Sequence, residues 1–264
     1  MEAQRQKGER FRTLHEGEPF LIPNPWDAGS AKVLEALGFE ALASSSSALA
    51  FTLGRPDGEA TPEEVMDHVR AVGQATAIPL SVDLENGYGP EPEDAASAIE
   101  RAAAAGAVGG SIEDFDPAGR IYDAGHAAER VAAAAEAARR LDFPFTFTAR
   151  AENHIRGNPD LDDTIARLQA YEAAGADVLY APGLRDGEEI RAVCEATGRP
   201  VNVLAHRGLT MTEIVEAGGQ RVSVGGSLAW TAVRSMAAAA EEMRDQGDFS
   251  SLAGYRPIKE WLGG

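Results

Sequence analysis

Short apolar runs alternate with longer alanine-rich amphipathic segments along the whole chain. The apolar runs predict strands at Phe20–Asn24, Ala41–Ser44, Leu80–Leu84, Gly109–Glu113, Phe145–Arg150, Val178–Tyr180, Val201–Leu204 and Arg221–Val224. The segments between them predict helices at Ala28–Leu37, Pro62–Ala75, Pro92–Ala105, Ala124–Leu141, Leu161–Ala174, Gly187–Ala196, Thr210–Ala217 and Ser227–Gln246. This alternation is typical of βαβ units and a parallel sheet. Eight units in 264 residues favour a closed (β/α)8 barrel over a doubly wound open sheet.

Length, composition and net charge limit the classes of protein to which the chain can belong. One domain over residues 1–264 is expected, with 247–264 as a packed C-terminal extension, because that stretch carries Tyr255, Ile258 and Trp261. The chain has no apolar run long enough to cross a membrane and no secretory signal, so we expect no membrane partner and a cytoplasmic location. A net charge of −18 argues against nucleic acid as a partner.

Four carboxylates are expected to meet at the carboxyl ends of the predicted strands, where barrels of this kind place their chemistry. They are Asp83, Glu85 and Glu113, joined by Asp57 from the loop after the second strand. Crowded carboxylates repel unless a cation or proton lies among them, and oxygen ligands suit Mg²⁺, with Mn²⁺ possible. The alternative for any single acid is that it caps a helix or pairs with an arginine, as Glu152 could with Arg150.

The same rim carries candidate groups for an anionic substrate. Ser45, Ser46 and Ser47 follow the second strand, and their hydroxyls and amides could receive a carboxylate, although a simple serine-rich turn is the alternative. Arg150 could hold a carboxylate or phosphate through two parallel hydrogen bonds. The predicted substrate site is completed by Asp83, Trp26 and His206.

Candidate groups for proton transfer come from the same loops. They are Glu152, Tyr122, His126 and His154, while Tyr88 is expected either to orient the site by a hydrogen bond or to pack in the core. His15 and His68 are expected on the surface. Only Lys7, Lys32 and Lys259 are lysines, and none ends a strand, which excludes a Schiff-base aldolase.

These segments together resemble the isocitrate lyase/phosphoenolpyruvate mutase superfamily. The resemblance is carried by the residues from Pro23 to Ala31, the serine run with Asp57, the segment Asp83-Leu84-Glu85-Asn86-Gly87-Tyr88-Gly89, the run Gly110–Asp114, and Thr148–Glu152. It implies a barrel whose last helix is exchanged between subunits of a homodimer or homotetramer, and Mg²⁺ chemistry on 2-oxo acids. It also implies that Asp83 ligates the metal, that Asp57, Glu85 and Glu113 hold its waters, that Ser45–Ser47 bind the substrate carboxylate, and that Arg150 contacts the oxo acid.

Departures from the family pattern reduce the number of family reactions that we expect for this chain. Family lyases that cleave isocitrate resemble one another in a loop with a K-K-C-G-H motif, whereas the matching residues 115–126 contain neither cysteine nor lysine. Authentic isocitrate lyase activity is therefore not expected. Family oxaloacetate decarboxylases share a histidine after the eighth strand, and here Val224–Ser227 has none.

The expected function is a Mg²⁺-dependent carbon–carbon lyase or decarboxylase acting on a small oxaloacetate-like 2-oxo diacid through a metal-stabilised enolate. One alternative is a C–P bond enzyme, either a phosphoenolpyruvate mutase or a phosphonopyruvate hydrolase. Another is a non-catalytic barrel that binds 2-oxo acids.

Overall fold

Eight parallel strands form one sheet in a computed structural model that describes residues 2–262. The strands are β1 (Phe20–Ile22), β2 (Leu42–Ala43), β3 (Leu80–Asp83), β4 (Gly109–Glu113), β5 (Thr146–Arg150), β6 (Val178–Tyr180), β7 (Val201–Leu204) and β8 (Arg221–Ser223). Their order is β1-β8-β7-β6-β5-β4-β3-β2, so the first strand pairs with the last. All eight predicted strands are confirmed, although several are shorter than the apolar runs.

Asn24 connects β1 and β2, which are the two strands at the ends of the hydrogen-bonded strand order. Just beyond β1, the Pro23 carbonyl accepts a 3.1 Å hydrogen bond from the Ala43 amide. The Asn24 side chain donates to the Ser44 carbonyl at 3.0 Å and accepts from the Val224 amide at 3.0 Å. These contacts link β1 with both β2 and β8, which brings the sheet close to full closure as the (β/α)8 prediction requires.

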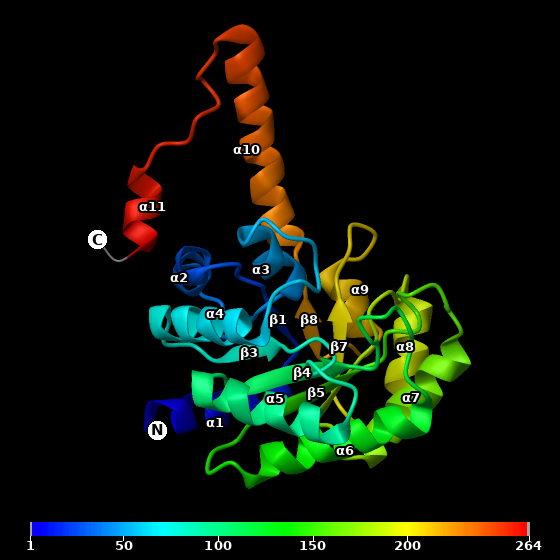
Figure 1. The fold of residues 1–264 in the computed structure, drawn as a ribbon. Coiled ribbons are helices and arrows are strands. Elements are labelled where there is room, and N and C mark those ends of the chain that lie inside the picture. The colour runs from blue at the N-terminus through cyan, green and yellow to red at the C-terminus, as the bar shows by residue number, and fades with distance from the viewer. Residues whose placement is uncertain (1, 263–264) are drawn as a thin grey trace.

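The predicted helices surround the strands, except for the last of them, which projects from the barrel (Figure 1). They are α2 (Ala28–Ala36), α4 (Pro62–Ala75), α5 (Pro92–Ala105), α6 (Ala124–Arg140), α7 (Leu161–Ala173), α8 (Gly187–Ala196), α9 (Met211–Glu216) and α10 (Ser227–Gln246). Their starts follow from the local sequence: Thr61 and Glu64 form a capping box at α4, with Pro62 in the first turn. The main apolar core lies between this ring and the strands.

Three helices were not predicted: α1 (Glu2–Glu16), α3 (Ser46–Thr52) and α11 (Arg256–Trp261). Helix α1 is largely polar, and its inner face is limited to residues such as Phe11 and His15, which pack with Phe20 of β1. The expectation that His15 and His68 lie on the surface is wrong. They are 9% and 8% exposed, because α1 and α4 turn them toward the barrel.

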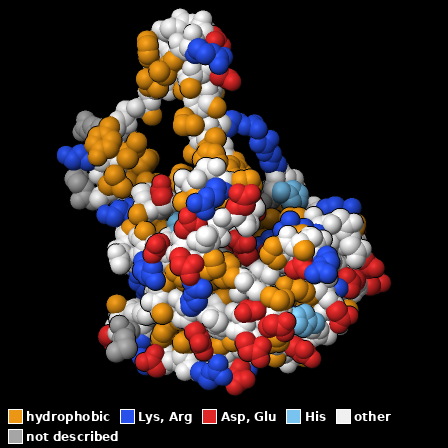
Figure 2. All heavy atoms as spheres, in the orientation of Figure 1, with side chains coloured by type: hydrophobic (Ala, Val, Ile, Leu, Met, Phe, Trp, Pro, Cys, Tyr) orange, Lys and Arg blue, Asp and Glu red, His pale blue; other side chains and the backbone are white. Residues whose placement is uncertain are grey.

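Helix α10 projects from the barrel, and α11 returns toward α2 (Figure 1). Apolar side chains lie open on this arm (Figure 2), among them Met236, Phe249, Leu252 and Tyr255. Both the packing of 247–264 and the exchange of the last helix between subunits stay predictions, and residues 263–264 lie outside the described chain. Within residues 2–262, none of the helices combines the length and apolar character that a membrane span requires.

We expect Phe11→Ala to destabilise the fold strongly, because α1 is attached through this ring. Phe11 is fully buried, and Gly109 of β4 leaves room for it: a Cβ there would lie 2.6 Å from the ring. Loss of a buried phenyl group costs about 3–5 kcal/mol, measurable as the free energy of unfolding in urea. The control Leu37→Ala removes a side chain that is 57% exposed and should change it by less than about 0.5 kcal/mol. Equal losses in both variants would contradict this role of α1.

Candidate active site

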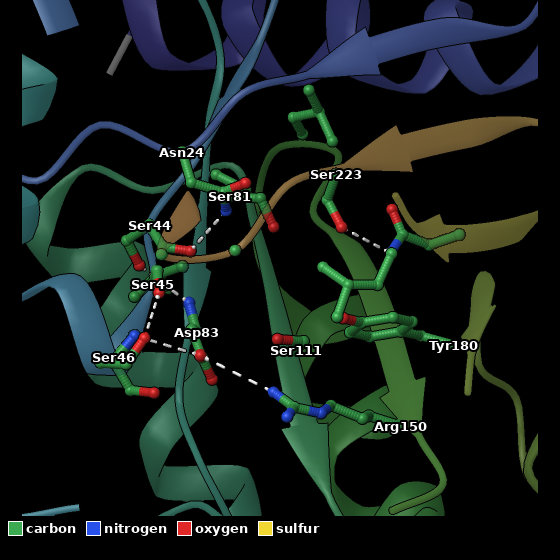
Figure 3. Close-up of a pocket in the computed structure, with 18 of the residues that line it drawn as sticks. Asn24, Ser44, Ser45, Ser46, Ser81, Asp83, Ser111, Arg150, Tyr180 and Ser223 are labelled. Atoms are coloured by element: carbon green, nitrogen blue, oxygen red, sulfur yellow. Dashed lines mark hydrogen bonds and ion pairs between the residues drawn. The ribbon is translucent and has the colours of Figure 1, made fainter. Parts of the chain in front are cut away.

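A polar cavity of about 260 Å³ enters the barrel from the carboxyl ends of the strands (Figure 3). A second cavity of about 330 Å³ adjoins it over the loops that follow β2, β3 and β4. The two share Ser46, Asp57, Arg150 and Arg156 as lining residues. The strands supply polar side chains to the first cavity, namely Ser81, Asp83, Ser111, Arg150, Tyr180, Asn202, Arg221 and Ser223.

Arg150, the last residue of β5, lies at the centre of the charged groups. Its Nη1 is 3.1 Å from Glu113 Oε2 and 3.7 Å from Asp83 Oδ2. Its Nε donates to Glu152, and its guanidinium lies 5.3 Å from the centre of the Tyr180 ring. Carboxylates from the ends of β3, β4 and β5 therefore share one buried cation, as the strand order β3-β4-β5 allows.

Asp83 is fixed by main-chain donors on both sides. Oδ2 accepts from the Ser46 amide at 3.2 Å, and Oδ1 accepts from the Glu85 amide at 3.1 Å. The residues after Asp83 turn sharply, since Glu85 and Tyr88 have positive φ angles of 50° and 66°. Non-glycine residues rarely adopt this conformation, and it is concentrated at functional sites.

Glu85 and Glu113 are site carboxyls whose pKa values are raised. Burial, reinforced by Asp83 and Asp57, raises the pKa of Glu85 to about 7, and its Oε1 is buried with no hydrogen-bond partner in the described part of the chain. Burial also raises the pKa of Glu113 to about 8; Glu152 and Asp83 add to this rise, and Arg150 and Arg156 oppose it. Carboxyls in this condition would be stabilised by a cation.

These observations fit a hard divalent ion held mainly through water. The donor set is all oxygen, and Glu85 offers a buried oxygen without a partner. In residues 2–262, however, no three or more His, Cys, Asp or Glu side chains are arranged to hold a metal directly. Asp83 as the direct ligand, with Asp57, Glu85 and Glu113 around its waters, stays a prediction compatible with both facts.

The serine run forms the start of α3 and not a free turn. The Ser45 side chain caps the helix by accepting from the Ala48 amide, and its hydroxyl lies 3.1 Å from that of Ser47. Ser45, Ser46 and Ser47 all line the first cavity. Ser45 and Ser46 face Arg150 across it (Figure 3). The structure thus brings the predicted carboxylate-binding groups to the same cavity as the acids.

Glu152 is fully buried between two arginines. It accepts from Arg150 Nε on one oxygen and from Arg156 Nε at 2.8 Å on the other, and its amide donates to Asp114 Oδ1 at 2.7 Å. Sequence reasoning missed Arg156, whose guanidinium also lies 3.9 Å from the centre of the Phe115 ring. Its spacing of four residues from Glu152 was the available signal.

Five of the predicted site residues, and the candidate base His126 as well, do not line either cavity. His154 is buried with Nε2 3.3 Å from Glu189 Oε2, and His206 is exposed with Nε2 3.1 Å from the Arg185 carbonyl. The others are Trp26, Tyr88 and Tyr122. Tyr122 accepts a 3.0 Å hydrogen bond from Asn86, and the Tyr88 hydroxyl is buried with no partner in the described chain. Their catalytic or binding roles stay predictions.

Comparison with known proteins agrees on one family. A family model described as phosphoenolpyruvate phosphomutase matches residues 11–244. An uncharacterized protein of Mycobacterium tuberculosis (strain ATCC 25618 / H37Rv) is 32% identical over 247 residues, covering 93% of this chain and 92% of the relative. An oxaloacetate decarboxylase of Bradyrhizobium sp. (strain BTAi1 / ATCC BAA-1182) is 32% identical over 230 residues, covering 83% and 78%.

Solved structures give the same result. A Burkholderia cenocepacia J2315 protein with a provisional lyase/mutase assignment is 48% identical and superimposes with a TM-score of 0.96, covering 100% of this chain and 98% of that one. A second protein of that organism, provisionally a phosphonomutase, is 37% identical with a TM-score of 0.86, covering 90% and 99%.

The raised pKa values of Glu113 and Glu85 predict an unusual pH dependence of stability. A carboxyl whose pKa is higher in the folded state contributes stability that is complete below the unfolded value, about 4.3, and is lost as pH rises through the folded value. With chelator present, the midpoint temperature of thermal unfolding should therefore decrease as the pH is raised from about 5 to about 8. Added Mg²⁺ should raise this midpoint temperature more at about pH 8.5 than at about pH 6, because the ion binds ionised carboxylates.

Glu113→Gln is the matched variant for this measurement, because it keeps the shape of the side chain and removes its titration. In this variant, the midpoint temperature of thermal unfolding should decrease less steeply as the pH rises. An unchanged slope in Glu113→Gln, or an equal Mg²⁺ effect at both pH values, would show that these carboxyls do not carry the effect.

Proposed function

The chain belongs to the isocitrate lyase/phosphoenolpyruvate mutase superfamily, and we propose that it is a divalent-metal-dependent carbon–carbon lyase or decarboxylase acting on a small 2-oxo diacid. The observation that carries the proposal is the position of Arg150, which faces a polar cavity while carboxylates from three adjacent strands surround it. Oxaloacetate is the first substrate to test. Similarity to an oxaloacetate decarboxylase at 32% identity supports that choice.

The acids at the rim would hold the metal, with Asp83 as the direct ligand and Asp57, Glu85 and Glu113 around its waters. A bound divalent ion would polarise the 2-oxo group and stabilise negative charge that develops on its oxygen. Asp83 is suited to a fixed position, because two backbone amides already orient its carboxylate. Glu85 and Glu113 would give up their protons as the ion arrives.

The substrate carboxylate would lie between the serine run and Arg150. Ser45, Ser46 and Ser47 line the cavity, and Arg150 lies opposite Ser45 and Ser46 (Figure 3). Glu152 keeps that guanidinium oriented by accepting from its Nε. Arg150 therefore acts as a preorganised anion contact, which lowers the cost of binding.

The positions of the possible bases favour decarboxylation over retro-aldol cleavage. Loss of CO₂ from a 3-carboxy-2-oxo acid requires an electron sink and no initial base, whereas retro-aldol cleavage begins with proton removal. Among the predicted bases only Glu152 lines the cavity, and both of its carboxylate oxygens accept from arginines. Tyr122, His126 and His154 lie outside it.

A second candidate is C–P bond chemistry. The 37% identical Burkholderia cenocepacia structure with a provisional phosphonomutase assignment favours it, and Arg150 with Arg156 could bind a phosphonate as well as a carboxylate. The lysine that phosphonopyruvate-handling members use has no counterpart in residues 115–126. This absence ranks C–P chemistry second.

Asp83→Ala should abolish most of the activity on oxaloacetate. We expect kcat/KM to fall at least about 100-fold, or about 2.7 kcal/mol of transition-state stabilisation, because the metal loses its direct ligand. Pyruvate formation is measured against Mg²⁺ alone, and chelator should remove the activity of the parent. The exposed variant Asp245→Ala serves as control. If Asp83→Ala turns over like the parent, the site assignment is wrong.

Phosphorus NMR separates the two candidates. With phosphonopyruvate and Mg²⁺, we expect the phosphonate resonance to persist over a time in which oxaloacetate is consumed. Appearance of inorganic phosphate or phosphoenolpyruvate would make the second candidate the function. If the protein binds 2-oxo acids but converts none of them, it is a non-catalytic binding barrel.

A further inference from the structure

Arg221 is a buried cation on the substrate cavity that the proposed reaction does not use. It is the first residue of β8, 5% exposed, and lines the same cavity as Arg150 and Ser46. Because β8 begins at the amino-terminal end of the barrel, Arg221 lies on the floor of the cavity and the acids lie at its mouth.

Three neutral groups hold the guanidinium. Nε donates to Asn202 Oδ1 at 2.8 Å, Nη2 donates to Thr148 Oγ1 at 3.0 Å, and Nη1 lies 3.2 Å from His15 Nε2. His15 must be a neutral acceptor here, because its Nδ1 is 2.8 Å from the Phe11 carbonyl, which can only accept. Burial, with Arg221 nearby, lowers the pKa of His15 to about 3 and keeps it neutral.

The positive charge of Arg221 is therefore not balanced by protein. No carboxylate in residues 2–262 forms an ion pair with it, in contrast to Arg150. An arginine has five N–H donors, and three are used, so Nη1 and Nη2 each keep one N–H without a protein acceptor in the described chain. A buried charge in this state is costly unless a partner of opposite sign binds it.

The depth of Arg221 sets the length of such a partner. Thr148, which contacts Arg221, lies two residues before Arg150 on β5, and both side chains point to the same face. At about 3.3 Å per residue, Arg221 contacts β5 about 7 Å below the position from which Arg150 extends. An unbranched diacid of about five or six carbons covers this distance better than oxaloacetate does.

We propose that Arg221 forms a floor subsite for the remote carboxylate of the substrate, whose 2-oxo acid end lies at Arg150 and Asp83. The preferred ligand is then a 2-oxo acid with a carboxylate more remote than that of oxaloacetate, and oxaloacetate leaves the subsite unfilled. In a substrate that is decarboxylated, this remote carboxylate is held and a separate carboxyl on C3 is lost as CO₂. The inference that the other end of the ligand is a 2-oxo acid rests on the proposed function. The inference of a remote carboxylate rests only on the contacts and burial of Arg221.

Calorimetric binding to 2-oxoglutarate and to 2-oxopentanoate tests the subsite, because the two ligands have equal chain length and differ in the remote carboxylate. In Mg²⁺ buffer, the parent should bind 2-oxoglutarate at least about tenfold more tightly, as expected for charge-assisted hydrogen bonds. Arg221→Met should reduce this preference to within about twofold and leave 2-oxopentanoate affinity unchanged. Arg140→Met, on the exposed face of α6, should keep the preference.

Three results would overturn the subsite: no preference in the parent, a preference that survives Arg221→Met, or an equal loss for both ligands. The last would show that Arg221 only supports the barrel. If Arg221→Met does not fold, the parent and Arg221→Lys are compared instead. Lysine keeps the charge but not the planar pair of Nη donors, so an unchanged preference in Arg221→Lys overturns the subsite.

Turnover separates this subsite from the proposed function. A parent that decarboxylates oxaloacetate but shows no diacid preference refutes the subsite alone. A parent with an Arg221-dependent preference that turns over no 2-oxo acid retains the subsite and refutes the proposed function.

Discussion

The sharing of one guanidinium among the carboxylates at the ends of β3, β4 and β5 is the interaction on which the site depends. Arg150 contacts Glu113 and Glu152 and lies near Asp83, so the three strand ends are bound into one charged group. The group still carries more acid than base, and burial together with the neighbouring carboxylates raises the pKa values of Glu85 and Glu113. A chain with a net charge of −18 can receive an anionic substrate only where arginines, or an added cation, reverse the sign locally.

This charge group is compatible with a stable barrel because the barrel interior is polar where it meets the cavity. Barrels of this class usually fill the interior with layers of bulky branched side chains. Here Ser81, Ser111 and Thr148 occupy such positions, and Asn202 and Ser223 bond to each other at 3.0 Å. The apolar core lies instead between the strands and the helices. Stability and ligand binding therefore use different layers of the same fold.

The sequence was sufficient to predict the strands and the helices around them, because their apolar periods are regular. It also predicted that Asp83, Glu113 and Arg150 come together, since each ends a strand and parallel strands end at one rim. Helix α1 escaped prediction because few of its residues are apolar. Arg156 and Arg221 were missed because their roles depend on which groups surround them in three dimensions. His154, His206 and Trp26 adjoin the same strand ends, but their side chains do not reach the cavity.

The loop after β4 shows how the chain differs from lyases that use a cysteine or lysine there. The Asp116 amide donates to the Arg120 carbonyl at 2.8 Å, and Phe115 pairs with Ile121, so the loop closes on itself as a small hairpin. Arg156 joins this hairpin to Glu152 by stacking on Phe115. The Arg156 guanidinium thus lies against the loop in which those lyases carry a thiol or amine. Because a guanidinium binds anions and does not give up its proton near neutral pH, these contacts support the proposed reaction, which begins by bond cleavage in a bound anion, over one that begins by proton transfer.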